Sequence, residues 1–134
     1  MIKALAHICF HVADIDKSLA FYTGKLGLEH AFDLNDGDGN RFGSYIHTGS
    51  RSFIELFQRD LAEKAEGQSF THMPLEVDDI EAAVADLRAK GVEVSDHVLA
   101  FDHNWQAWLT DPDGNSIELH GYTPKSDQFR MLGE

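Results

Sequence analysis

Cysteine and basic residues are scarce in this sequence, and each scarcity excludes a class of protein. Cys9 is the single cysteine among 134 residues, so no intrachain disulfide can form, and a reducing compartment such as the cytoplasm is expected. Only 11 Lys and Arg residues stand against 23 Asp and Glu residues, a net charge of −12. This charge repels phosphate backbones and anionic lipids. We therefore expect a small-molecule substrate and neither a nucleic-acid nor a membrane partner.

Long hydrophobic runs are absent as well. No segment approaches the roughly 20 apolar residues that span a bilayer. The N-terminal segment MIKALAHICF is too short and too polar for a signal peptide. A hydrophobic content of 43% over 134 residues is ordinary for a globular protein, so we expect a single domain over residues 1–134.

Two parts of the chain repeat one pattern. A shift of 65 residues places His7 on His72, and both copies close on Ile-Glu-Leu, around Glu55 and Glu118. Each copy begins with a strand-like run, at 4–12 and 70–77. Helices are predicted from Asp14 to about 24–27 and from 78 or 79 to Gly91, with a capping box that begins at Asp78. Turn signals at 35–40, 47–51 and 111–115 separate the strands that follow.

The repeat predicts two modules, each with a strand, a helix and about three further strands. The first module covers residues 3–60 and the second covers 68–122. A short polar helix or linker is expected at 60–67, and a polar tail without clear structure at 123–134.

Strand alternation brings one His and one Glu of each module to the same face of its sheet. Apolar neighbours take the other face, which leaves His7, Glu55, His72 and Glu118 on the concave side. Two imidazoles and two carboxylates suit one borderline divalent ion, and a carboxylate between two Phe residues, as at 55, is costly to desolvate without a cation. His11 lies about 13 Å along the strand from His7, so one ion cannot bind both.

These stretches resemble the vicinal oxygen chelate superfamily and, within it, glyoxalase I-like proteins. The resemblance covers residues 5–122 and is carried by His7–Leu28, Phe53–Leu56, Thr71–His72 and Asp111–Leu119. It implies an α+β fold in which two βαβββ modules form a half-barrel, the glyoxalase/bleomycin resistance/dioxygenase fold. It also implies a homodimer and one divalent ion (Ni, Zn, Mn, Co or Fe) held by the same four residues, from one chain or from two.

The resemblance implies a metal-dependent lyase or isomerase, similar to lactoylglutathione lyase. Such an enzyme acts on a small oxygen-chelating substrate through a metal-stabilised enediolate, with Glu118 moving the proton and Glu55 sharing the transfer. Three alternatives are an epimerase of a keto acid or keto sugar, an Fe(II) extradiol-type dioxygenase, and a metal-free, drug-resistance-like binding protein. The fourth ligand Glu55 argues against the dioxygenase, and retention of all four ligands argues against the binding protein.

The substrate contacts depart from glyoxalase I. Basic residues that hold glutathione there are not obvious, since position 11 is His and position 24 is Gly, which argues against glutathione. The segment 101–108 suits a polar or sugar-like molecule. We predict substrate contacts from His11, His103, Asn104 and Trp105, with the two Trp residues at 105 and 108 serving as core or as pocket wall.

Overall fold

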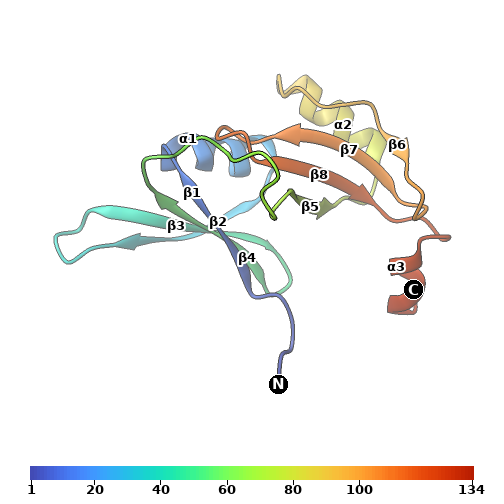
Figure 1. Ribbon diagram of the computed structural model, residues 1–134, viewed down its shortest axis with the longest axis horizontal. Helices are drawn as coiled ribbons and strands as arrows, with labels where there is room; N and C mark the ends of the chain where they lie inside the picture. The colour runs from blue at the N-terminus through green and yellow to red at the C-terminus, as the bar shows by residue number, and fades with distance from the viewer. The chain divides into compact units, whose positions relative to one another are not determined.

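The computed structural model describes residues 1–134 and divides into two compact units, Met1–Glu66 and Gly67–Glu134. The units repeat one succession of a strand, a helical segment and three further strands (Figure 1). Each succession builds a four-stranded mixed sheet with helices packed against it. The predicted α+β fold of two βαβββ modules is therefore confirmed. The boundary between the units falls in the segment 60–67, which forms no helix.

The first unit holds the strand order β1-β4-β3-β2, with β1 parallel to β4 and the other pairs antiparallel. Its elements are β1 (His7–Val12), α1 (Ile15–Leu19), the π-helical η1 (Ala20–Lys25), β2 (Glu29–Asn35), β3 (Arg41–Gly49) and β4 (Ser52–Gln58). Asp14 begins the helix, because its carboxylate accepts hydrogen bonds from the backbone N–H groups of Asp16 and Lys17. The predicted helix continues as one wider π turn, and Gly27 follows it in the left-handed region at φ +72°.

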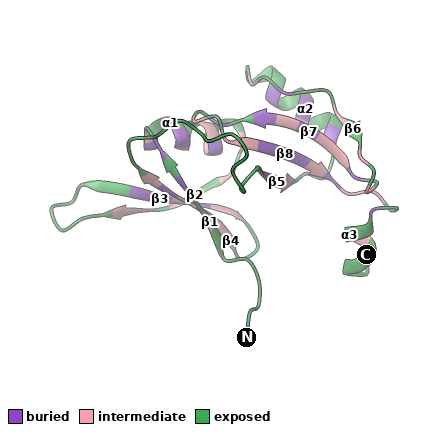
Figure 2. Ribbon diagram, in the orientation of Figure 1, coloured by how far each residue is buried: buried purple, intermediate pink, exposed green.

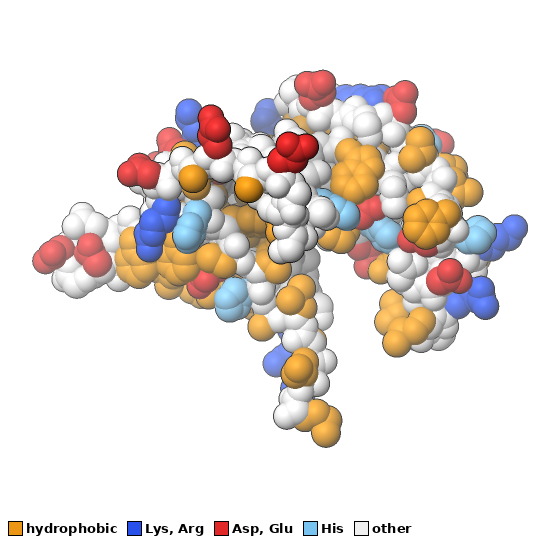
Figure 3. Space-filling model, viewed as in Figure 1, with side chains coloured by type: hydrophobic (Ala, Val, Ile, Leu, Met, Phe, Trp, Pro, Cys, Tyr) orange, Lys and Arg blue, Asp and Glu red, His pale blue; other side chains and the backbone are white.

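The core of this unit lies on the helix-facing side of the sheet. Phe10 and Val12 of β1 and Ile54 and Leu56 of β4 are buried there, as the alternation predicted. Figure 2 shows these strands with buried segments, whereas the outer end of the β2–β3 hairpin, at residues 35–42, is exposed. Hydrophobic side chains gather over that hairpin and acidic side chains lie at its tip (Figure 3).

The second unit holds the strand order β5-β8-β7-β6, with β5 parallel to β8. Its elements are β5 (His72–Glu76), α2 (Ile80–Ala89), β6 (Val98–Leu99), β7 (Trp105–Thr110), β8 (Ser116–Gly121) and α3 (Asp127–Leu132). The helix α2 buries Ile80, Val84 and Leu87, the face that the sequence predicted. The predicted capping box is wrong, because Asp79 caps the helix by accepting a hydrogen bond from the Ala82 N–H.

The prediction that residues 123–134 lack clear structure is wrong, because the helix α3 forms within them. Ser126 caps α3 by accepting a hydrogen bond from the Phe129 N–H. Asn104 Nδ2 donates to Gln128 Oε1 at 2.7 Å, which anchors this short helix to the chain before β7. A partner 24 residues away in sequence supplies this anchor, so local patterns do not report it. No helix in the structure is long and apolar enough to span a bilayer.

Candidate metal centre

Strand register builds the first half of the candidate centre. Cys9 on β1 and Tyr45 on β3 both lie opposite Glu55 on β4, so the Glu55 side chain points to the sheet face away from the helix. His7 lies two residues before Cys9 on the same face. Its Nε2 is 3.7 Å from Glu55 Oε1, and the Glu55 side chain is 14% exposed. One imidazole and one carboxylate therefore meet in the first module.

The second module repeats this pair. Pro74 on β5 and Trp108 on β7 lie opposite Glu118 on β8, so His72 and Glu118 share one face of the sheet. His72 Nε2 is 3.6 Å from Glu118 Oε2, and the Glu118 side chain is only 5% exposed. A carboxylate buried to this degree is costly without a nearby positive charge.

The donor atoms of both pairs fit a divalent ion. Two ligands that bind one ion with bonds of about 2.1 Å place their donor atoms about 3.0 to 3.4 Å apart. The separations of 3.7 and 3.6 Å in the two pairs lie just above that range, so each pair would need only a small side-chain adjustment to bind an ion. The structure contains no cluster of three or more His, Cys, Asp or Glu side chains that could hold a metal ion. Instead, each module contributes one His and Glu pair. The residues that could hold a metal are thus the predicted His7, Glu55, His72 and Glu118.

Tyr45 is a site residue that the sequence analysis missed. Its hydroxyl donates a hydrogen bond to Glu55 Oε2, and its ring lies edge-on to the His7 ring, with centroids 5.6 Å apart. The hydrogen bond to Glu55, with burial and the carboxylate charge adding to it, raises the pKa of Tyr45 to about 12. The repeat in the sequence could have identified Tyr45. The spacing of 63 residues that relates Glu55 to Glu118 also relates Tyr45 to Trp108, so each module has an aromatic residue at the matching position.

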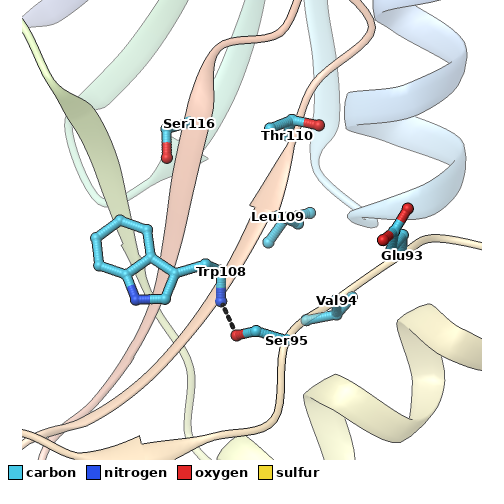
Figure 4. Close-up of a pocket in the computed structure, with 7 residues that line it drawn as sticks. All are labelled: Glu93, Val94, Ser95, Trp108, Leu109, Thr110 and Ser116. Carbon is cyan, nitrogen blue, oxygen red and sulfur yellow. Dashed lines mark hydrogen bonds between the residues drawn. The ribbon is translucent and has the colours of Figure 1, made fainter.

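Trp108 takes the place of Tyr45 in the second module. Its ring lies edge-on to the His72 ring, with centroids 4.8 Å apart. Its backbone N–H donates to Ser95 Oγ at 2.8 Å, which secures β7 beside the loop that follows α2 (Figure 4). A cavity of about 410 Å³ adjoins this position, and it is lined by Glu93, Val94, Ser95, Trp108, Leu109, Thr110 and Ser116. Hydroxyl groups and one carboxylate, with no basic side chain, make up its polar lining.

Two further groups approach the carboxylates. His120 Nδ1 is 3.4 Å from Glu118 Oε1, in an orientation that does not form a hydrogen bond. Burial raises the pKa of the Cys9 thiol, and a hydrogen bond to Glu55 raises it further. A raised pKa disfavours the thiolate form that a nucleophilic cysteine needs.

The predicted substrate residues fall in different places. His11 lies exposed on the Glu55 face of its sheet, opposite Phe57. His103 is an exposed turn residue with φ +64°, and its carbonyl accepts a hydrogen bond from Thr123 Oγ1 at 2.6 Å. Asn104 is fully buried and its Nδ2 donates to Gln128 Oε1, whereas its Oδ1 is buried without a hydrogen-bond partner. The structure therefore does not bring His103 or Asn104 into contact with Glu118.

Trp105 lies on the opposite side of the sheet from Glu118. Trp105 pairs with Gly121, which lies next to Ile80 of α2. Gly121 is three residues after Glu118, and residues an odd number apart on a strand point to opposite faces. Trp108, three residues later, is the tryptophan that shares the face of Glu118. The sequence predicts core or pocket wall for both tryptophans, and the strand register places them on opposite faces.

Comparisons with known proteins agree with this architecture. Residues 4–119 match the model of the Glyoxalase/Bleomycin resistance protein/Dioxygenase superfamily. The chain is 33% identical over 129 residues to a probable lactoylglutathione lyase of Synechocystis sp., with 92% of this chain and 98% of the relative covered. It is 28% identical over 131 residues to the metallothiol transferase FosB of Staphylococcus epidermidis, with 92% and 85% covered. A probable chloroplastic lactoylglutathione lyase of Arabidopsis thaliana and a lactoylglutathione lyase of Schizosaccharomyces pombe also match, and the chain spans less than half of each.

Solved structures extend the comparison to a binding protein. The crystal structure of TnmS3, an antibiotic binding protein from Streptomyces sp. CB03234, superposes with a TM-score of 0.74 at 26% identity. The alignment covers 91% of this chain and 98% of that one. From the matched family model and the repeated modules, this chain belongs to the Glyoxalase/Bleomycin resistance protein/Dioxygenase superfamily.

Proposed function

We propose that this protein is a divalent-metal-dependent lyase or isomerase of the glyoxalase I type, acting on a small substrate with adjacent oxygen atoms. One observation carries the proposal: the same His and Glu pair, with facing donor atoms 3.7 and 3.6 Å apart, occurs in both modules. A repeated residue pair does not by itself require a metal. Here, however, each pair places a mostly buried carboxylate beside an imidazole nitrogen, and this arrangement favours a bound metal ion.

His7, Glu55, His72 and Glu118 would hold one ion together, either within one chain or across a homodimer. This set supplies two neutral nitrogen and two anionic oxygen ligands, so it balances the charge of a divalent ion. When bound, the ion would act as a Lewis acid toward the substrate oxygens. Relatives named lactoylglutathione lyase support this reaction class.

Glu118 is the residue proposed to move a proton between neighbouring substrate carbon atoms. Its side chain is buried, and no hydrogen bond fixes the oxygen that faces His120. A buried carboxylate with one oxygen free of hydrogen bonds suits a general base, because that oxygen can accept a substrate proton without first losing a bound water molecule. The sequence predicts that Glu55 shares this transfer, but the hydrogen bond from the Tyr45 hydroxyl to its Oε2 favours the role of a ligand for Glu55.

The cavity beside Trp108 is proposed to take the part of the substrate that does not react. Its polar lining of Glu93, Ser95, Thr110 and Ser116 favours hydroxylated or uncharged groups over carboxylates. A hemithioacetal of a neutral thiol, or an epimerisable keto sugar, fits this lining better than glutathione does. The net charge of −12 also disfavours a substrate with anionic groups such as those of glutathione.

Elemental analysis of the purified protein, combined with turnover assays, tests the proposal. We expect about one divalent ion per chain and proton exchange or isomerisation with hemithioacetals, 2-keto acids or keto sugars. Metal in stoichiometric amount with oxygen consumption on catechols would favour an Fe(II) dioxygenase instead. Tight binding of small aromatic molecules by metal-free protein would favour a binding protein, as the likeness to TnmS3 allows.

A further inference from the structure

Glu55 has its two oxygens in different environments. Oε2 accepts the hydrogen bond of the Tyr45 hydroxyl, whereas Oε1 faces His7 Nε2 at 3.7 Å. Tyr45 is itself held in place, because its ring stacks on Phe32 with centroids 4.7 Å apart and lies edge-on to Phe53. One oxygen of Glu55 is therefore tied to a fixed donor, and the other is presented on the side of the imidazole.

Glu118 has a different second partner. Its Oε2 faces His72 Nε2 at 3.6 Å, as the repeat requires, but its Oε1 faces His120 Nδ1 at 3.4 Å without a hydrogen bond. The residue that corresponds to Tyr45 is Trp108, whose ring carries no hydroxyl group. The two carboxylates of the candidate centre are thus held unequally.

We propose that Tyr45 is a positioning residue that would hold Glu55 as a metal ligand through Oε1, whereas Glu118, which has no such donor, keeps one oxygen loosely held. This inference rests on the proposed metal-dependent function. A hydrogen-bond donor to the second oxygen of a ligating carboxylate limits the rotation of that carboxylate and so keeps it oriented toward the metal. Loss of such an outer hydrogen-bond partner commonly weakens metal binding about 10- to 100-fold. A hydrogen bond to a charged acceptor is also stronger than one between neutral groups.

Cobalt(II) titration of four variants of the full chain tests the assignment. The variants are Tyr45→Phe, Glu55→Ala, the double variant, and Tyr22→Phe as the matched control. Tyr22 is a fully buried tyrosine of the same module on η1, so its substitution removes a hydroxyl from the core and not from the site. Binding is followed by the visible absorption of bound Co²⁺ and by competition with a chromophoric chelator, at a temperature where every variant is folded.

We expect Tyr45→Phe to weaken Co²⁺ binding about 10-fold and to alter the visible spectrum, because Glu55 can then rotate. Tyr22→Phe should leave both unchanged. In the Glu55→Ala background, Tyr45→Phe should cause no further loss, since a residue that acts through Glu55 has nothing left to position.

Wild-type Co²⁺ affinity and spectrum in Tyr45→Phe would overturn the inference and leave the proposed function intact. An equal loss with and without Glu55 would also overturn it, because Tyr45 would then act through general packing. Failure of the wild-type chain to bind Co²⁺ at all would overturn the proposed function and this inference together.

Discussion

The imidazole of His72 lies edge-on to the indole of Trp108, with ring centroids 4.8 Å apart and an interplanar angle of 77°. The first module has the same relationship between His7 and Tyr45, at 5.6 Å and 67°. Each candidate ligand histidine is therefore braced by an aromatic residue from the strand that lies next to its glutamate partner. The repeat extends beyond the four candidate ligands to an aromatic ring that lies edge-on to each histidine.

Trp108→Ala should weaken divalent metal binding several-fold, because His72 loses the ring that limits its rotation. The matched control is Trp105→Ala, which removes a tryptophan of the same strand from the opposite face of the sheet. We expect Trp105→Ala to lower the unfolding temperature while leaving the metal affinity of the folded protein unchanged. Calorimetric titration with Zn²⁺ and thermal unfolding measure the two effects. Equal metal affinity in wild type and Trp108→Ala would contradict the bracing role.

Glu118→Gln should reduce turnover by roughly 10²- to 10⁴-fold, the range over which a positioned general base contributes. The amide keeps the size and one coordinating oxygen of Glu118, so the variant should still bind metal, though more weakly. Turnover is compared at saturating metal, which separates loss of the base from loss of the ion. His97→Ala is the control, since His97 lies 3.7 Å from Glu81 and 5.2 Å, ring to ring, from Trp105, away from the Glu118 face. Full turnover by metal-loaded Glu118→Gln would rule out this carboxylate as the proton carrier.

Asp33→Asn should remove a pH-dependent part of the stability. The hydrogen bond from Ser44, with a second from His30, lowers the pKa of Asp33 below its usual value. A carboxyl whose pKa is lower in the folded state stabilises the protein above its unfolded pKa, near 4, and this stabilisation is lost as the pH falls through the folded value. We expect Asp33→Asn to cost about 1 kcal/mol at pH 7 and less at pH 3.

Urea unfolding at the two pH values measures this difference. Asp38→Asn, at the exposed tip of the same hairpin, is the control and should change little at either pH. A cost for Asp33→Asn that is the same at pH 3 and pH 7 would show that ionisation of Asp33 does not contribute.

Gly43→Ala should destabilise the first module by about 1 to 3 kcal/mol, because the added methyl group has no room. A Cβ atom at this position of β3 would lie 2.9 Å from the Leu56 carbonyl oxygen and 3.1 Å from both Leu34 Cδ1 and Phe57 Cδ1. Gly24→Ala is the control, since a Cβ atom there meets nothing within 4 Å and the residue lies in the helical segment η1. Gly24→Ala should be neutral or slightly stabilising. Chemical denaturation compares the two, and a neutral Gly43→Ala would contradict the close approach of β4.

Features that depend on near neighbours in sequence were predictable from the sequence. Asp14 caps the first helix, and Ile80, Val84 and Leu87 form the buried stripe of the second, because helical spacing and capping act over three or four residues. The faces of His7, Glu55, His72 and Glu118 followed from strand alternation in the same way. Their joint binding of one ion remains the prediction that metal analysis tests.

By itself, the sequence determined the duplication, the faces of the strands and the His and Glu pair in each half. Only the tertiary structure decided that Tyr45 lies opposite Glu55, that Trp108 and not Trp105 shares the face of Glu118, and that Asn104 anchors α3 through Gln128. Alternation states which side of a sheet a residue takes, whereas hydrogen-bonded register and contacts between distant segments decide which residues meet there.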